Sequence, residues 1–494
     1  MTTARIRGFI AVSVMLSTIM QVLDTTIANV ALPHMQGALS ASTEQVTWVL
    51  TSYIVATAIM TLPVGYVSRR FGRRRVFLCS VAGFTVASML GGQAGSLGEM
   101  VLWRVVQGIC GAALVPLSQS VLLDTFPVEK HASAMSIWGT GVMLGPILGP
   151  TLGGWLTEYY SWRWVFYINL PIGIASFAGI YFFVRDTEPV RQRFDIAGFL
   201  LLALAVASLQ LLLDRGEHLK WFGSREIQLY LLVCLGSLYF FFVHNLTGSQ
   251  RFFSPGLFRD RNFVSGVTFI FFLGVILLAT MVLLPPFLQV WKGYPVVTTG
   301  LVLVPRGVGT MVTMILAARL MRRFDPRAVI TTGMVFVGLS LQQMAGFTLQ
   351  VGAWPVVASG FLQGLGLGLV FVPVSALAYA TLPAALRDEG TALFNLARNL
   401  GTSVGVSIVM AFLARNLWIN EQQLGARLAP EVLAGQPLPP VADLLALPAG
   451  VAEAVAGQAA EIAFANDFQL LFWVNLLAMP LVLLLRVPGR QRAA

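Results

Sequence analysis

The chain has 494 residues, of which 56% are hydrophobic and only 11% are charged. Soluble globular proteins carry about 25% charged residues, so this composition excludes an ordinary water-soluble domain and favours a membrane protein. The formal charge of +10 does not indicate a nucleic-acid partner, because the basic residues cluster in short segments between long apolar runs. Cys79, Cys110 and Cys234 lie inside those runs without metal-ligand spacing, so neither a metal site nor a disulfide is expected.

Fourteen apolar runs are long enough to cross about 30 Å of hydrocarbon. We expect helices, because lipid offers backbone groups no hydrogen-bond partner. The first run follows Arg5 and Arg7 and has no small-residue cleavage motif, so we interpret it as a retained span and not as a signal peptide. The expected spans are 10–32, 46–66, 77–96, 101–123, 132–156, 164–184, 196–213, 227–247, 263–285, 297–317, 329–348, 353–374, 391–414 and 466–486.

The distribution of basic residues orients these spans. With the N-terminus in the cytoplasm, 22 of the 32 basic residues fall in cytoplasmic segments and seven fall in outer loops. The other three, Arg104, Arg306 and Arg398, fall inside spans. Because positively charged loops are retained inside, we predict a multi-pass protein of the bacterial inner membrane with both termini in the cytoplasm.

Internal repeats indicate two related halves. GYVSRRFGRRRV (65–76) resembles ARLMRRFDPRAV (318–329), and VVQGICGAALVPLSQSVLLDTFP (105–127) resembles FLQGLGLGLVFVPVSALAYATLP (361–383). Apolar composition alone does not keep Arg, Gln, Gly and Pro in the same order, and parallel halves around a central site are a transporter architecture. We predict a six-helix half over 1–190, an inserted helix pair over 191–250, and a second six-helix half over 251–494 with a long outer loop at about 415–465.

Two charged residues lie in the spans of the first half. Asp24 is the lone acid of an apolar span, where a carboxylate is costly and normally faces a cavity or a partner. Burial and neighbouring charge tune the proton affinity of a carboxyl group, which suits a proton carrier, although Asp24 could also serve helix packing. Arg104, close to Gln107, keeps its charge and needs a carboxylate, carbonyls or water. It could pair with Asp24 or extend to the outer membrane face.

Polar residues also interrupt the second half. Asn395, Arg398, Asn399 and Thr402 share one helical face, which indicates either a substrate cavity or a gate at the membrane edge. Arg306 lies between Pro305 and Gly307, where the helix is locally weakened, and we assign it to the same cavity or gate as the polar face.

The fifth span has small residues at every fourth position. Such spacing allows close helix contact, and prolines permit bending, so the span is predicted to be a hinge seam or a static packing surface. The residues concerned are Gly141, Gly145, Pro146, Gly149, Pro150 and Gly153.

The loop after the second span is dense in arginine. In so short a cytoplasmic turn we interpret these bases as a topology signal and not as a patch for lipid phosphates or nucleic acid. The candidate residues are Gly65, Arg69, Arg70, Gly72 and Arg73. No phosphate-binding loop for ATP occurs in the sequence, so we expect no cofactor and an ion gradient as the energy source.

Several of these motifs resemble the major facilitator superfamily, and more narrowly its fourteen-helix drug:proton antiporter branch of the EmrB/QacA type. The resemblance rests on LDTTIANVALP (23–33), RVVQG (104–108), GVMLGPILGPTLGG (141–154), WRWVFYINLPIG (162–173) and NLARNLGTSVG (395–405). One position departs from the pattern, because Arg69 stands where the family's second loop usually has an acid. That departure puts the customary charge relay of this loop in doubt.

The resemblance implies proton-driven export of hydrophobic or amphipathic compounds by alternating access, with Asp24 and Arg104 in proton coupling. It also implies a periplasmic membrane-fusion adaptor and an outer-membrane channel as partners, and the outer loop is a candidate docking surface or a plain linker. Two alternatives stay open: an importer or facilitator of a small metabolite, and a non-transporting membrane sensor.

Overall fold

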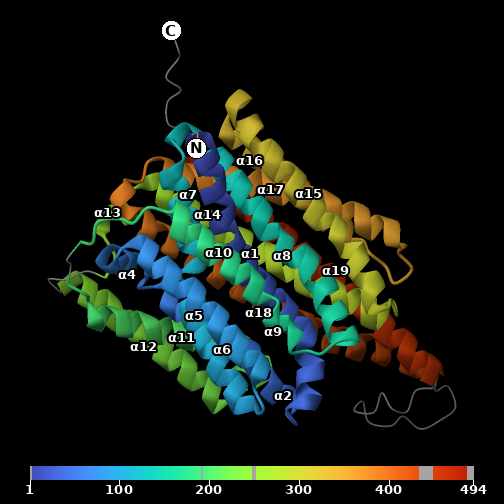
Figure 1. Ribbon diagram of the computed structural model, residues 1–494. Coiled ribbons are helices and arrows are strands. Elements are labelled where there is room, and N and C mark those ends of the chain that lie inside the picture. Colours follow the sequence, from blue (N-terminus) through green and yellow to red (C-terminus); the bar gives the residue numbers. More distant parts are fainter. Residues whose placement is uncertain (1–2, 191–192, 218, 248–251, 433–448, 487–494) are drawn as a thin grey trace.

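A computed structural model describes residues 3–190, 193–217, 219–247, 252–432 and 449–486 as a bundle of long helices (Figure 1). Across these ranges no strand occurs. Thirteen helices are long and apolar enough to cross a membrane. A fourteenth span is present if α3 (Trp48–Thr61) and α4 (Val64–Phe71), which meet at a bend of 58°, are counted as one. The expected all-α polytopic fold with fourteen spans is confirmed.

The helices up to residue 250 follow the expected spans, with short additions at their ends. Ser96 and Asp195 accept backbone N–H bonds at the starts of α6 and α11, which satisfies donors that a helix leaves free. Besides α3 and α4, the helices are α1 (Thr3–Ala38), α2 (Thr43–Val46), α5 (Arg73–Gln93), α6 (Leu97–Gly111), α7 (Leu114–Thr125), α8 (His131–Tyr159), α9 (Trp164–Tyr167), α10 (Asn169–Phe183), α11 (Ile196–Arg215) and α12 (Arg225–Thr247).

The remaining helices form the second part of the bundle. They are α13 (Pro255–Arg259), α14 (Arg261–Pro286), the π-turn η3 (Phe287–Trp291), α15 (Val296–Arg323), α16 (Pro326–Ala345), α17 (Ala353–Ala380), α18 (Arg387–Val432), α19 (Ala449–Ala478) and the 3-10 helix η6 (Met479–Leu484). The segment expected to be a long outer loop is largely helical, since α18 runs to Val432 and α19 starts at Ala449. Residues 433–448 lie outside the described part of the chain.

The start of α1 and the end of the described chain lie on one side of the bundle, which we call the terminal side (Figure 1). There Phe9 of α1 stacks on Phe183 at the end of α10, with ring centroids 4.9 Å apart. After η6, the backbone of Arg486 exchanges hydrogen bonds with the side chain of Asn262, at the start of α14. An even number of crossings therefore separates the two ends.

A further sequence similarity, which the structure brings out, links α10 and α19. Phe166–Leu170 reads FYINL and Phe472–Leu476 reads FWVNL, so Asn169 and Asn475 occupy equivalent places. Asn169 bonds to Ser88 of α5, and Asn475 bonds to the backbone of Met334 in α16. Each asparagine thus ties a late helix of one repeat to the equivalent earlier helix. The domain limits at residues 190 and 250 remain predictions.

Of the helix pair α11 and α12, α11 packs against both repeats, and α12 packs against α11. Asp214 of α11 accepts a hydrogen bond from Thr51 of α3. Gln210, one turn earlier, donates to Ser403 of α18 at 2.9 Å. The pair therefore lies beside the interface between the repeats and not apart from it.

Candidate functional site

Asp24 lies at the centre of a buried polar group, which we call the Asp24 cluster: Asp24, Arg104, Gln107 and Asn169. One carboxylate oxygen of Asp24 accepts from Arg104 Nη1 at 2.6 Å. The other accepts from Gln107 Nε2 at 2.9 Å and Asn169 Nδ2 at 2.7 Å. Asp24 is 1% exposed and Arg104 is fully buried. The cluster joins α1, α6 and α10, and its donors are arranged for an ionised carboxylate.

Arg104 is held on several sides. Its Nε donates to the backbone oxygen of Val49, and its Nη1 also donates to Gln107 Oε1, both at 2.9 Å. The guanidinium lies 4.3 Å from the ring centroid of Tyr53 and 5.8 Å from that of Phe166. A planar cation stacked on an aromatic ring and bonded to a carboxylate is a role that lysine fills poorly. The alternative of a side chain extended to the membrane surface is wrong, because Arg104 has no exposed area.

The glycine stripe of α8 packs against α1. A β-carbon added at Gly145 would lie 2.5 Å from Val22, and one at Gly149 would lie 2.2 Å from Thr26. Thr26 Oγ1 donates to the backbone oxygen of Gly145. Gly141 and Gly153 contact α1 in the same way, through Met15 and through Ile27 and Val30. The stripe thus holds α8 against the helix that carries Asp24. The side chains of Pro146 and Pro150 lie outside what the structure describes.

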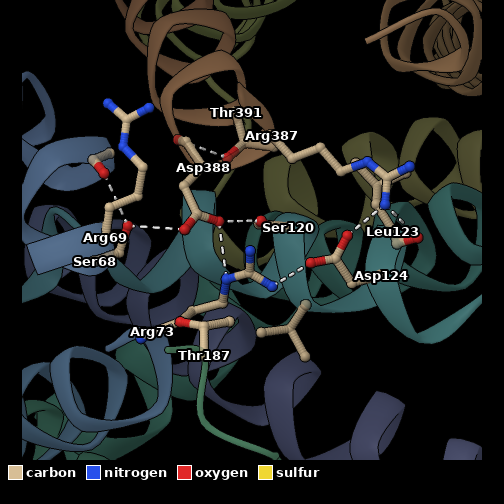
Figure 2. Close-up of polar contacts among 12 residues, drawn as sticks. Ser68, Arg69, Arg73, Ser120, Leu123, Asp124, Thr187, Arg387, Asp388 and Thr391 are labelled. Atoms are coloured by element: carbon tan, nitrogen blue, oxygen red, sulfur yellow. Dashed lines mark hydrogen bonds and ion pairs between the residues drawn. The ribbon is translucent and has the colours of Figure 1, made fainter. Parts of the chain in front are cut away.

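Charged residues on the terminal side form a second polar group, which we call the terminal-side network. Its members lie on α4, α5 and α7 of the first repeat and on α18 of the second (Figure 2). They are Ser68, Arg69, Arg73, Ser120, Asp124, Arg387, Asp388 and Glu389.

Asp388 is the centre of this network. It accepts from Ser68 Oγ at 2.8 Å and from Ser120, and it pairs with Arg73 Nε at 2.9 Å. Asp124 pairs with both Arg73 and Arg387, so it contacts one cation from each repeat (Figure 2). These bonds join the two repeats on the terminal side.

Arg69 has an acidic partner in the second repeat. Its Nη2 pairs with Glu389 Oε2 at 2.9 Å, so the acid comes from α18 and the base from α4. Glu389 also accepts from the backbone N and the Oγ of Ser254, which precedes α13. A β-carbon added at Gly65 would lie 2.6 Å from Cα of Glu389, so glycine permits α4 to approach α18 this closely.

The other residues of the loop are placed differently. Gly72 has φ +92°, a conformation that favours glycine, and it separates α4 from α5. The described contacts give Arg70 no ion pair. The loop therefore has a role in contact between the repeats in addition to its positive charge.

The polar face of α18 is divided. Asn395 donates to Gln119 of α7 at 2.6 Å, which adds a bond between the repeats. The backbone oxygen of Arg398 lies against Gly274 of α14. Asn399 accepts from Thr402 through its backbone oxygen only. Arg306 donates to the backbone oxygen of Leu277 at 2.7 Å and is buried. The structure therefore does not bring Arg306, Arg398 and Asn399 into one hydrogen-bonded group.

Sequence reasoning missed several members of these groups. Asn169 lies in a span, where an amide is a signal for interhelical bonding, but in the sequence it stands out only as part of the motif WRWVFYINLPIG. Asp124, Asp388 and Glu389 lie at helix ends, where acids are ordinary, so nothing in their spacing distinguishes them. The excess of arginine in the loop is the one available signal that acids are needed opposite it.

A family model described as the Major Facilitator Superfamily matches residues 14–406. The chain belongs to this superfamily. It is 34% identical over 420 residues to the multidrug export protein EmrB of Escherichia coli (strain K12), covering 84% of this chain and 80% of that protein. It is 33% identical over 425 residues to the fatty acid resistance protein FarB of Neisseria gonorrhoeae, covering 86% and 84%.

The fold of the superfamily is also found among solved structures. The proton:xylose symporter XylE matches with a TM-score of 0.60 and 15% identity, over 95% of this chain and 97% of that one. The expected membership and fold are thereby confirmed, and the chain is a membrane transporter and not an enzyme.

Proposed function

We propose that this protein exports hydrophobic or amphipathic drugs across the bacterial inner membrane in exchange for protons, by alternating access. The observation that carries the proposal is the Asp24 cluster, in which a buried acid and a buried arginine form an ion pair within one repeat. The names of the relatives support the substrate class, since they describe multidrug export and fatty acid resistance.

The Asp24 carboxylate of this cluster can bind a proton. Protonation of Asp24 removes the negative charge that holds Arg104, and the arginine then lacks its anionic partner in a buried site. Because α8 packs on α1 through the glycine stripe, a shift at Asp24 is transmitted to a helix that also packs against α15 of the second repeat. Protonation thereby favours a change in how the repeats meet.

The terminal-side network supplies the matching gate. In alternating access one side of the bundle must open while the other closes. The ion pairs of Asp388 and Glu389 close the terminal side, and they must break for substrate to enter there. With the termini in the cytoplasm, this is the side from which a drug is loaded.

The energy source and the partners follow from the same proposal. The proton gradient drives the cycle, with no bound cofactor. Small hydrophobic substrates enter from the cytoplasm or the inner leaflet of the bilayer. A periplasmic membrane-fusion adaptor and an outer-membrane channel would carry them onward, and the stretch at about 415–465, of which 433–448 lie outside the described residues, is the candidate docking surface.

A test in cells uses a bacterial host that lacks its own drug pumps. Expression of this chain should lower accumulation of a hydrophobic fluorescent dye and raise resistance to hydrophobic drugs. Adding a protonophore should abolish the difference, because it collapses the gradient. Higher accumulation on expression would indicate import, and no change with any compound would favour a sensor.

A further inference from the structure

Asp467 of α19 is a second buried acid, and it belongs to neither group described above. Its side chain is fully buried, and neither of its carboxyl oxygens has a hydrogen-bond partner among the described residues. It lies 15 residues after Ala452 and 17 before Leu484, the ends of its candidate span. The apolar stretch of this segment is the span expected at 466–486, so Asp467 lies near the end of the span that is remote from the termini, yet inside the protein.

The surroundings of Asp467 are apolar. It lies on the buried face of α19 with Phe464, Phe468 and Leu471. Phe464 contacts Phe287 of η3, with ring centroids 5.3 Å apart, and Phe468 contacts Phe347, with centroids 6.4 Å apart. Asp467 thus lies in sequence between two aromatic residues that pack against other elements, and its side chain has no exposed area.

No cation compensates Asp467 among the described residues. The elements packed on α19 are α14, α16, α18, η3 and η6. Arg398, Arg415 and Glu421 of α18 are the charged residues of these elements that lie farthest from a helix end, and no ion pair to Asp467 occurs in the described chain. The other charged residues of these elements are Arg261, Arg327, Arg387, Asp388, Glu389, Arg427 and Glu431.

The two membrane acids therefore differ in this conformation. Asp24 has three hydrogen-bond donors, one of which is the cation Arg104, and this is an environment for an ionised carboxylate. Asp467 has none, and an isolated buried carboxylate is so costly that such a group neutralises. We propose that Asp467 is a second proton-binding site, which holds a proton while the terminal side is closed and exchanges it during transport.

We expect Asp467 to exchange its proton with the solvent on the side of the membrane opposite the termini. The acids of α19 are Glu453, Glu461 and Asp467, and no ionisable residue lies between Asp467 and Arg486. Glu461, the nearest acid, is partly exposed and accepts from the backbone N of Leu349. Protons would thus reach Asp467 along the end of the helix that carries acids.

The binding step can be tested without transport. Infrared spectra of the purified full chain in lipid vesicles at neutral pH report the C=O stretch of protonated carboxyl groups. The wild type should show such a band that is lost in Asp467→Asn and kept in Asp24→Asn. A spectrum of Asp467→Asn that is identical to the wild type in this region would overturn the proposal.

The exchange step rests on the proposed function and is tested in proteoliposomes by counting protons per exported substrate. Asp467→Asn, which has the same shape but cannot lose a proton, should move one proton fewer, and Asp467→Glu should restore the count. An unchanged count in Asp467→Asn would make Asp467 a static neutral residue and overturn the exchange. If transport by the wild type did not depend on the pH gradient, the proposed function would be wrong. The infrared test of a protonated Asp467 does not depend on that result.

Discussion

Arg104 and Asp24 depend on each other for burial in the membrane. Arg104 has no exposed area, and its ion pair with Asp24 is 2.6 Å long. Removing one partner of such a pair leaves an uncompensated charge, which typically costs about 3–5 kcal/mol. The energetic effect of a substitution here therefore includes the cost to the residue that remains.

Substitutions of Arg104 should rank in a definite order. Arg104→Lys keeps the charge but not the planar contact with Tyr53 or the bond to Val49, so we expect weak transport and a modestly lower melting temperature. Arg104→Ala should abolish transport and should lower the melting temperature several times more than Arg104→Lys does. Thermal unfolding and dye efflux of both variants provide the comparison. Wild-type behaviour of Arg104→Ala would show that the ion pair is dispensable.

How far the sequence predicts the site depends on how unusual each residue is in its place. Asp24 and Arg104 are charges inside apolar spans, so their cost in lipid distinguishes them from the sequence alone. Glu389 is one of several acids at helix ends, and only the approach of α4 at Gly65 makes it the partner of Arg69. Such a contact joins residues 320 positions apart, and sequence spacing contains no information about it.

At the scale of helices, hydropathy predicts the spans well because lipid imposes both their length and their composition. It predicts their ends poorly. α18 runs to Val432, well beyond the expected end at 414, because polar residues can extend a helix outside the bilayer. Hydropathy also gives no sign of the bend between α3 and α4, although Pro63 lies at it and lacks the N–H that a continuous helix needs.

The contact between α1 and α8 gives a prediction with a matched control. Gly149→Leu places a side chain where Thr26 lies, two residues after Asp24. Overpacking of this kind typically costs about 1–3 kcal/mol, so we expect a lower melting temperature and reduced transport. Gly154→Leu lies on the same helix with no atom within 4 Å of the added β-carbon, and it should resemble the wild type. Equal melting temperatures of the two variants would contradict the packing described here.

At the scale of the whole molecule, the terminal-side network decides whether the two repeats meet on that side. Its bonds come from α4, α5 and α7 on one side and from α18 on the other (Figure 2). Arg69 stands where the resemblance leads one to expect an acid, and its partner Glu389 supplies the acid from α18, so this pair is suited to an exchange experiment.

Arg69→Glu should open the terminal side, because two acids then face each other. Combining it with Glu389→Arg should restore part of the closure, since the pair is rebuilt but Ser254 loses its acceptor. Arg70→Glu is the control, because it makes the same charge reversal at a neighbouring residue that is not part of the network. The distance between spin labels at Phe71 and Phe324, both exposed, measures closure in a variant without the native cysteines. No lengthening in Arg69→Glu would show that this pair does not hold the repeats together.

Transport by purified protein in proteoliposomes, driven only by an imposed pH gradient, tests the central claim most directly. The account predicts that wild type moves a hydrophobic drug against the proton flow and that protons cross in proportion. Asp24→Asn should fold, bind drug and fail to respond to the gradient, because the neutral amide cannot exchange a proton. Gradient-driven export by Asp24→Asn at the wild-type rate would contradict the assignment of proton coupling to this residue.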